Sequence, residues 1–278
     1  MTSPRQKPLT KFLPIKNDLT TTYFLSLIIA FLMTAVSLGG LFFPAVFYPS
    51  DELRQAYLAN DAVNLIVGLP ILLGSMWLTN RGKLVGLLCW PGALLYTFYN
   101  YIAYVIGMPL SWLTVLFAIL VLLCGNLTFV LAKEIDWQSI QNRLAGKVHE
   151  KISGGVLIFY GAAFFFLAIS VITGSNTDKA GVTMPDIGVA IADLILSTLL
   201  FVGGILLFRH KPFGYASGMG LLFATSALFI GVIWVVVLQP VLSTAPFVLE
   251  DLIVLFGMGL ICLIPTGLFL RGVMSEGK

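Results

Sequence analysis

Long apolar stretches dominate this chain and leave few folds open to it. Eight segments are long enough to cross a membrane as helices, since a crossing takes about 20 mostly apolar residues. Hydrophobic residues make up 58% of the 278 positions and charged residues only 10%, which excludes an ordinary soluble domain. The sequence therefore predicts an all-α membrane protein with eight transmembrane helices. Their predicted bounds are 22–47, 61–79, 84–106, 111–132, 153–173, 187–208, 213–238 and 247–270.

The positive charges are sharply sided along these segments. If the N-terminus is cytoplasmic, fourteen of the sixteen Lys and Arg residues fall on the inner side, and only Arg54 and Lys179 fall outside. Because Lys and Arg are enriched in cytoplasmic loops, we expect a multi-pass protein of the cell membrane with both termini cytoplasmic. The expected partner is the lipid bilayer. The charge distribution gives no support for nucleic-acid binding, and the sequence does not fix the oligomeric state.

Two basic turns suggest that the chain has two similar halves. Arg81-Gly82-Lys83 aligns with Arg209-His210-Lys211 at an offset of 128 residues, and four predicted spans lie on each side of the middle linker. Two parallel-oriented halves of this kind would be related by a pseudo-twofold axis along the membrane normal. An even split without any repeat is the alternative. The predicted parts are an N-terminal tail (1–21), a first four-helix half (22–132), an interfacial linker helix (133–152), a second half (153–270) and a C-terminal tail (271–278).

Acidic residues gather on the predicted outer side. An acid-rich mouth concentrates cations and repels anions, although acids at helix N-termini also simply suit the helix dipole. Asp193 lies sixteen residues before Arg209, which places it inside the outer leaflet, and Asn64 reaches a similar height. Ionisable groups at such depths are costly and are therefore functional candidates. The outer acids are Asp51, Glu52, Asp61, Asp178, Asp186, Asp193, Glu250 and Asp251.

The third predicted span carries a polar stripe. Tyr96, Asn100 and Tyr104 recur every four residues and so share one helix face. Such a face can line a polar cavity, whereas the alternative is that the outer tyrosines belong to an aromatic belt at the membrane interface. The predicted substrate-binding residues are Asp61, Asn64, Tyr96, Asn100, Tyr104, Asp193, Glu250 and Asp251.

Several chemistries have no support in the sequence. Cys89, Cys124 and Cys262 lie in apolar runs without a CxxC spacing, and both histidines fall in basic surroundings on the inner side. No Gly-rich phosphate loop, GxSxG elbow or HExxH motif occurs. We therefore expect no metal and no cofactor. An enzyme is disfavoured, although a site of carboxylates and tyrosines would lack all these motifs.

A long central stretch resembles a known group of proteins. DAVNLIVGLPILLGSMWLTNRGKLVGLLCWPGALLYTFYNYIAYVIGMP, together with the closing MGLICLIPTGLFLRG, is similar to an uncharacterised group of prokaryotic polytopic integral membrane proteins. The resemblance covers most of the chain. It implies a cell-membrane location, and it transfers no activity and no functional residue.

Three functions remain open at this stage. The first is binding or transport of a small cationic or polar solute through an outward-facing acidic cavity between the halves. The second is a non-transporting scaffold, assembly factor or sensor that binds partners through the linker helix around Trp137. The third is an intramembrane enzyme acting on a lipid-like substrate with its outer carboxylates.

Overall fold

The described part of the chain is helical, apart from short connections. The computed structural model describes residues 13–174, 181–244 and 246–275, so that Arg5, Lys7, Lys11, Asp178, Lys179 and Lys278 lie outside the described residues. In chain order the elements are α1 (Thr20–Phe42), α2 (Pro44–Phe47), α3 (Asp51–Val63), the π-helical turn η2 (Asn64–Gly68), α4 (Leu69–Asn80), α5 (Leu84–Gly107), α6 (Trp112–Glu134), α7 (Trp137–Leu144), α8 (Glu150–Ile172), α9 (Met184–Phe208), α10 (Pro212–Leu242) and α11 (Leu249–Ser275).

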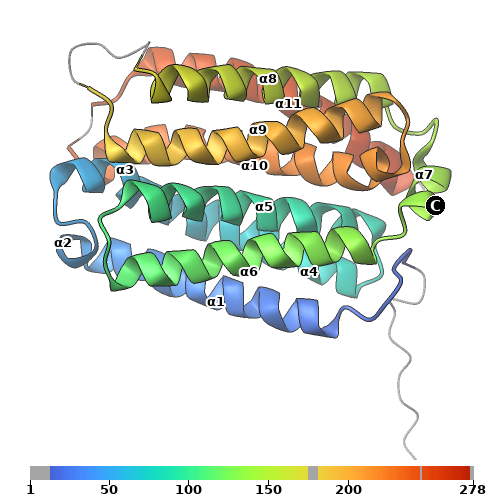
Figure 1. Ribbon diagram of the computed structural model, residues 1–278, viewed down its shortest axis with the longest axis horizontal. Coiled ribbons are helices and arrows are strands. Elements are labelled where there is room, and N and C mark those ends of the chain that lie inside the picture. The colour runs from blue at the N-terminus through green and yellow to red at the C-terminus, as the bar shows by residue number, and fades with distance from the viewer. Residues whose placement is uncertain (1–12, 175–180, 245, 276–278) are drawn as a thin grey trace, which may run out of the picture.

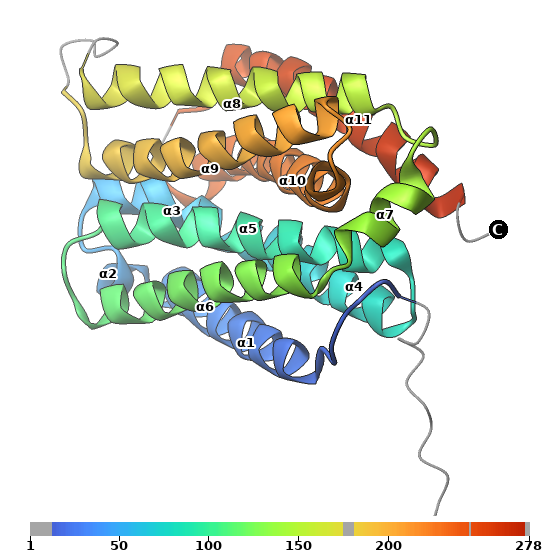
Figure 2. The same cartoon turned by 45° about the vertical axis from the view of Figure 1, so that its right-hand side comes forward.

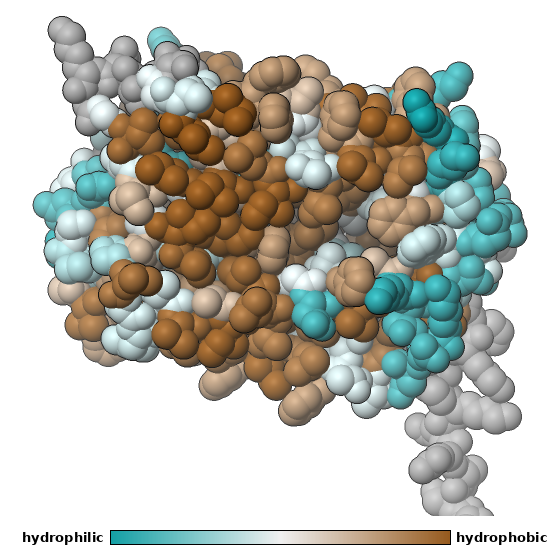
Figure 3. Space-filling view, viewed as in Figure 1, coloured by the Kyte–Doolittle hydropathy of each residue, from teal (hydrophilic) through white to brown (hydrophobic). Residues whose placement is uncertain are grey.

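Most of these helices fit a membrane protein. Among the described residues, seven helical segments are long and apolar enough to cross a bilayer: α1, Asp51–Asn80, α6, α8, α9, α10 and α11. The helices lie side by side, and on the face drawn in Figure 3 apolar surface covers the middle while hydrophilic residues gather at the two ends. These features support the prediction of a multi-pass membrane protein.

Helix α5 is long but is not among the seven apolar segments. Its sequence LVGLLCWPGALLYTFYNYIAYVIG is diluted by tyrosines, an asparagine and a proline. It lies in the middle of the bundle, against α4, α6, α9 and α10 (Figures 1 and 2), and most of its residues are buried. A helix surrounded by protein can carry polar groups because neighbouring helices rather than lipid satisfy them.

The contact between α5 and α10 depends on two glycines. A Cβ atom at Gly92 would overlap the backbone carbonyl of Gly220, and a Cβ atom at Gly220 would lie 3.0 Å from the Leu88 carbonyl oxygen. Small residues of this kind let two membrane helices approach closely. The two glycines are 128 residues apart, the same offset that relates the two basic turns.

The two basic turns have the same backbone path. Gly82 and His210 both adopt positive φ, at 71° and 55°. The next residue donates its backbone N–H to a carbonyl five positions earlier in each case, Lys83 to Leu78 at 3.0 Å and Lys211 to Leu206 at 2.8 Å. The two turns therefore have the same local structure. This match concerns the turns and not the whole halves.

The second predicted span begins earlier than expected. We predicted a span over 61–79, but α3, η2 and α4 form one continuous helical segment, Asp51–Asn80. Ser50 caps its start, accepting a hydrogen bond from the Leu53 backbone N–H at 3.3 Å, as its position before two acids indicates. The polar composition of residues 51–61 does not indicate a buried helix. In the structure, however, Leu53 and Tyr57 on one face of this helix are buried.

Two other predicted boundaries move for local reasons. The span predicted over 22–47 is interrupted, because α1 ends at Phe42 and Pro44 starts the separate turn α2. The linker helix predicted over 133–152 is shorter, since α6 continues to Glu134, α7 covers only Trp137–Leu144 and α8 already begins at Glu150.

Substitution of Gly92 tests the central contact. Gly92→Ala is expected to lower the free energy of unfolding by about 1–3 kcal/mol, because the added methyl group must displace the α10 backbone. Equilibrium unfolding in mixed micelles measures the change. The matched control is Gly74→Ala in α4, where a Cβ atom has open space around it. Equal stability of the two variants would contradict the close α5–α10 approach.

Candidate functional site

The Asp61 carboxylate lies at the centre of a buried network near one end of the bundle. Tyr48 Oη donates to Oδ2 of Asp61 at 2.6 Å, and Tyr104 Oη donates to Oδ1 at 3.0 Å. Asp61 is 1% exposed and both phenols are fully buried. Each carboxylate oxygen therefore has one strong donor, and the three groups come from α3, from α5 and from the connection between α2 and α3.

Aromatic rings and a glycine shape the space around this carboxylate. Tyr57 stacks on Tyr48 with ring centroids 5.9 Å apart, and its centroid is 4.4 Å from that of Tyr104. Tyr101 lies beside Tyr104, with its hydroxyl 3.5 Å from the Ser37 hydroxyl on α1. A Cβ atom at Gly40 would overlap the Asp61 carboxylate, so α1 can approach Asp61 this closely only because residue 40 is a glycine.

A half-buried amide links the network toward the surface. The Nδ2 atom of Asn60 lies 3.3 Å from the Tyr104 hydroxyl, which itself contacts Asp61. Tyr48 covers the carboxylate from the end of the bundle, where Arg54 Nε donates to the Tyr48 carbonyl oxygen at 3.0 Å. Burial, together with the nearby Asp61 charge, raises the pKa of Tyr48 well above its ordinary value, so this phenol serves as a hydrogen-bond donor.

Asn64 adds an unusual feature one turn along from Asp61. Its side chain is fully buried, and neither the amide nitrogen nor the amide oxygen has a hydrogen-bond partner. Asn64 also begins the π-helical turn η2, an irregularity that is frequent at functional sites. A buried amide without partners is costly, and the hydrogen-bonding capacity of this one is unused in the structure.

Asp193 belongs to a second, separate acid–phenol pair. Tyr99 Oη donates to Asp193 Oδ1 at 2.9 Å, and Asp193 is 7% exposed on α9. Tyr99 and Tyr104 are both on α5 but bond different carboxylates. The structure thus brings Asp61 and Tyr104 together, and it gives Asp193 another partner.

The remaining predicted residues fall into two groups. Tyr96 and Asn100 are buried on α5; Asn100 Nδ2 donates to the Tyr96 carbonyl oxygen at 2.9 Å, and the Tyr96 ring lies against Gly68 and Gly231. Glu250 and Asp251 are exposed in the first turn of α11, away from any described network. Their position matches the helix-dipole interpretation of the outer acids.

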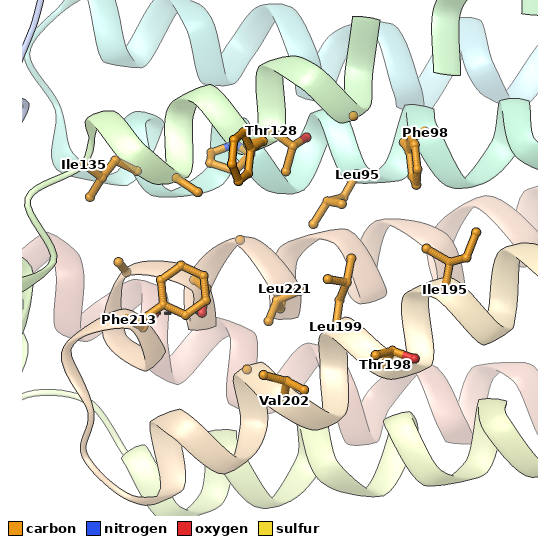
Figure 4. Close-up of a pocket in the computed structure, with 18 of the residues that line it drawn as sticks. Leu95, Phe98, Thr128, Ile135, Ile195, Thr198, Leu199, Val202, Phe213 and Leu221 are labelled. Carbon is orange, nitrogen blue, oxygen red and sulfur yellow. Dashed lines mark hydrogen bonds between the residues drawn. The ribbon is translucent and has the colours of Figure 1, made fainter. Parts of the chain in front are cut away.

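None of the predicted residues lines the principal cavity between the helices. That cavity has a volume of about 470 Å³ and is bordered by α5, α6, α9 and α10, with almost entirely apolar walls (Figure 4). A smaller hollow of about 260 Å³ lies at the end of the bundle beside Asp51, Arg54 and Thr244. Asp61, Asn64, Tyr96 and Asp193 are buried, so the acidic groups do not face an open cavity in this structure.

The Asp61 carboxylate has no basic ion-pair partner among the described residues. No Lys or Arg in the described part of the chain lies within ion-pair distance of Asp61 or Asp193. Within the same residues, no group of three or more His, Cys, Asp or Glu is placed to hold a metal ion. A carboxylate in this setting is stabilised by hydrogen bonds alone, unless it takes up a proton or another cation.

Sequence reasoning missed the residues that complete the network. Ser37, Tyr48, Tyr57 and Tyr99 were not among the predicted site residues. Tyr48 lies in a Pro-flanked connection, where nothing in the letters indicates burial. For Tyr57 the available signal was its helical spacing of four residues from both Leu53 and Asp61.

Comparison with known proteins gave no match among protein-family models, curated proteins or solved structures. The resemblance to a prokaryotic membrane-protein group therefore stays a prediction, and the site has to be interpreted from its own geometry.

A double-mutant cycle tests the separation of the two acid sites. We expect Asp61→Leu and Tyr104→Phe to be coupled by roughly 0.5–3 kcal/mol in unfolding free energy, because the two side chains share a buried hydrogen bond. Asp61→Leu and Tyr99→Phe should be additive, since Tyr99 bonds Asp193 instead. Unfolding in mixed micelles gives both values. Strong coupling of Asp61 to Tyr99 would mean that the networks act as one.

Proposed function

We propose that this protein binds and moves a small cation, a proton or a monovalent metal ion, with the Asp61 carboxylate as its central group. The observation that carries the proposal is the buried Asp61–Tyr48–Tyr104 network, which has no basic partner and lies next to the unpartnered Asn64. A buried negative charge attracts a cation strongly because little water screens it.

Each side chain has a role in this proposal. Asp61 supplies the charge, and the phenol oxygens of Tyr48 and Tyr104 and the free amide oxygen of Asn64 replace part of the hydration shell of the ion. Asn64 follows Asp61 by three residues on a helix, so the two share a face. Asn60 connects Tyr104 to the acid-rich end. Entry requires the Tyr48 segment to move, since Asp61 is 1% exposed.

The proposal places the network in the outer half of an eight-helix protein of the cell membrane, with both termini cytoplasmic. Helix α5 has 24 residues, about 36 Å at 1.5 Å per residue, which exceeds the ~30 Å of a bilayer core. It runs alongside the seven apolar segments from one end of the bundle to the other (Figure 1), which supports α5 as the eighth span. The asymmetry of Lys and Arg supports the orientation.

A parallel relation of two four-helix halves is part of the same proposal. The matched backbone of the two basic turns supports it, as does the contact of Gly92 with Gly220 at the same offset. The helix contacts support it too: α5 touches α4, α6 and α9, and α10 touches the corresponding α9, α11 and α3. A twofold axis would then pass between α5 and α10.

The scaffold alternative has less support from the geometry. Its partner would bind the linker helix α7, but Ile140 and Leu144 of that helix are fully buried and the Trp137 ring packs on Phe213, with centroids 4.8 Å apart. The apolar face of α7 is thus occupied by the protein itself, which leaves only its polar face for a partner.

Cysteine labelling tests whether α5 crosses the membrane. Lys83→Cys and Leu110→Cys place exposed thiols at the two ends of α5. In intact cells we expect a membrane-impermeant maleimide to label Leu110→Cys and to label Lys83→Cys only after permeabilisation. The native chain is the background control, because Cys89, Cys124 and Cys262 are buried. Labelling of both positions from one side would contradict a spanning α5.

Ion uptake by proteoliposomes tests the function itself. With the purified protein reconstituted, uptake of H⁺, Na⁺ or K⁺ under an imposed potential should exceed that of empty vesicles. Asp61→Asn should reduce it at least about tenfold, since one lost charge interaction of about 1.4 kcal/mol already has that effect. The matched control is Asp51→Asn, which removes an exposed carboxylate from the same helix.

Two outcomes would contradict this function. One is uptake that Asp61→Asn leaves unchanged. The other is wild-type protein that neither moves these ions nor changes its carboxyl infrared bands when they are added. Thermal unfolding of Asp61→Asn in the same lipids separates loss of function from loss of fold.

A further inference from the structure

The apolar cavity between the two sides of the bundle lies apart from the acid–phenol networks. Leu95 and Phe98 of α5 and Thr128 of α6 border it from one side, and Leu199 of α9 and Leu221 of α10 face them from the other (Figure 4). Its volume of about 470 Å³ is in the range of small-molecule sites, which is roughly 300–1,000 Å³.

The hydroxyl groups of Thr128, Thr198 and Ser217 in its walls already use their donor hydrogens within their own helices. Thr128 Oγ1 donates to the Cys124 carbonyl at 2.8 Å, Thr198 Oγ1 donates to the Leu194 carbonyl at 3.0 Å, and Ser217 Oγ donates to the Phe213 carbonyl at 2.8 Å. Because these donors are already used within their own helices, the cavity presents an apolar surface. A polar solute would lose hydration there without compensation.

The cavity opens sideways, toward the surface that a bilayer would cover. Phe129, Ile195, Leu199 and Val202 line it and are each more than a third exposed. They belong to α6 and α9, two of the apolar segments that are long enough to cross a membrane. The molecules that meet this opening in a membrane are lipid chains.

One end of the cavity is basic. The Lys133 ammonium lies 4.2 Å from the centroid of the Phe129 ring, the Lys16 ammonium lies 5.6 Å from the centroid of the Trp137 ring, and both rings line the cavity. Lys16 Nζ also donates to the Lys133 carbonyl oxygen at 2.8 Å, so the two residues are adjacent.

The acids near these lysines form no ion pair with them, although the Lys16 charge contributes, after the Ser139 and Gln138 hydrogen bonds, to the lowered pKa of Asp136. Glu134 accepts a hydrogen bond from Asn17 at 2.8 Å, and Asp136 caps α7 through the Gln138 and Ser139 backbone N–H groups. Within the described residues no carboxylate lies within 4.0 Å of either ammonium. An apolar slot with a basic end matches the two parts of an anionic lipid.

We propose that this cavity is a binding site for one glycerophospholipid with an anionic headgroup. An acyl chain fills the space between α5, α6, α9 and α10, and the headgroup phosphate lies beside Lys16 and Lys133. The proposal is independent of the cation site, because none of the groups around Asp61 takes part in it.

Native mass spectrometry with two lipids of equal acyl chains tests the site. The purified protein in neutral detergent is incubated with phosphatidylglycerol or with phosphatidylcholine, and the retained lipid is counted. Wild-type protein should hold phosphatidylglycerol roughly tenfold more tightly, because its headgroup has a net negative charge for the two lysines, whereas the choline group of phosphatidylcholine neutralises its phosphate. The double variant Lys16→Gln, Lys133→Gln should lose this preference, whereas Lys83→Gln, a control at a basic turn that does not line the cavity, should keep it.

Filling the cavity gives the second arm of the test. Val202→Trp should reduce retention of both lipids, because the indole occupies the acyl-chain space. Val115→Trp is the matched control, since Val115 is also exposed on a long apolar helix but does not line the cavity. Equal retention of the two lipids by wild-type protein, an unchanged preference after the lysine substitutions, or an unaffected Val202→Trp variant would each overturn the proposal.

Discussion

Polar groups can remain inside an apolar bundle only if the protein itself satisfies them. The position of α5 meets this requirement, because the helix is surrounded by α4, α6, α9 and α10. Its tyrosines therefore donate to Asp61 and Asp193 instead of facing lipid. The same central position needs close backbone approach, which Gly92 and Gly220 permit. Larger residues at Gly92 and Gly220 would keep α5 away from the centre of the bundle. Outside the centre, the phenols of α5 would lack their carboxylate partners.

The positions of the helices were largely predictable from the sequence, because helices long enough to cross a membrane are recognised by their length and apolar composition. Most of the predicted segments match observed helices to within a few residues. The errors occurred where letters and packing disagree. Residues 51–61 look like a surface segment, yet Leu53 and Tyr57 are buried against the bundle. Helix α5 shows the same disagreement, since it is less apolar than the other long helices and yet more deeply buried.

The site was only partly predictable, for a geometric reason. Spacing along one helix places Tyr96, Asn100 and Tyr104 on one face, but it does not give the partner across the gap. Tyr48 reaches Asp61 through a turn after Pro44, and Tyr99 rather than Tyr96 meets Asp193. Both contacts depend on the tertiary structure and not on spacing along one helix. The two acids also lack equivalents at the offset of 128 residues, where Val189 corresponds to Asp61 and Leu65 to Asp193. If a repeat relates the halves, it includes the arrangement of the helices and not the acidic side chains.

The π-helical turn next to Asp61 gives the network a means to change. A π-helical turn holds one residue more than the α-helix around it, so shifting the turn along the chain rotates the residues it passes by about 100°. Asn64 begins η2, and a shift there would re-aim its unpartnered amide while α3 and α4 stay helical. The cost of such a shift is small in hydrogen bonds, because Pro70 just beyond η2 lacks a backbone donor in any case. A ligand that bonds the Asn64 amide in only one of the two arrangements would select that arrangement, since a ligand shifts an equilibrium by its difference in affinity for the two states. Under the proposed function, the unsatisfied Asn64 amide and the irregular turn would together link occupancy beside Asp61 to the path of the helical segment Asp51–Asn80.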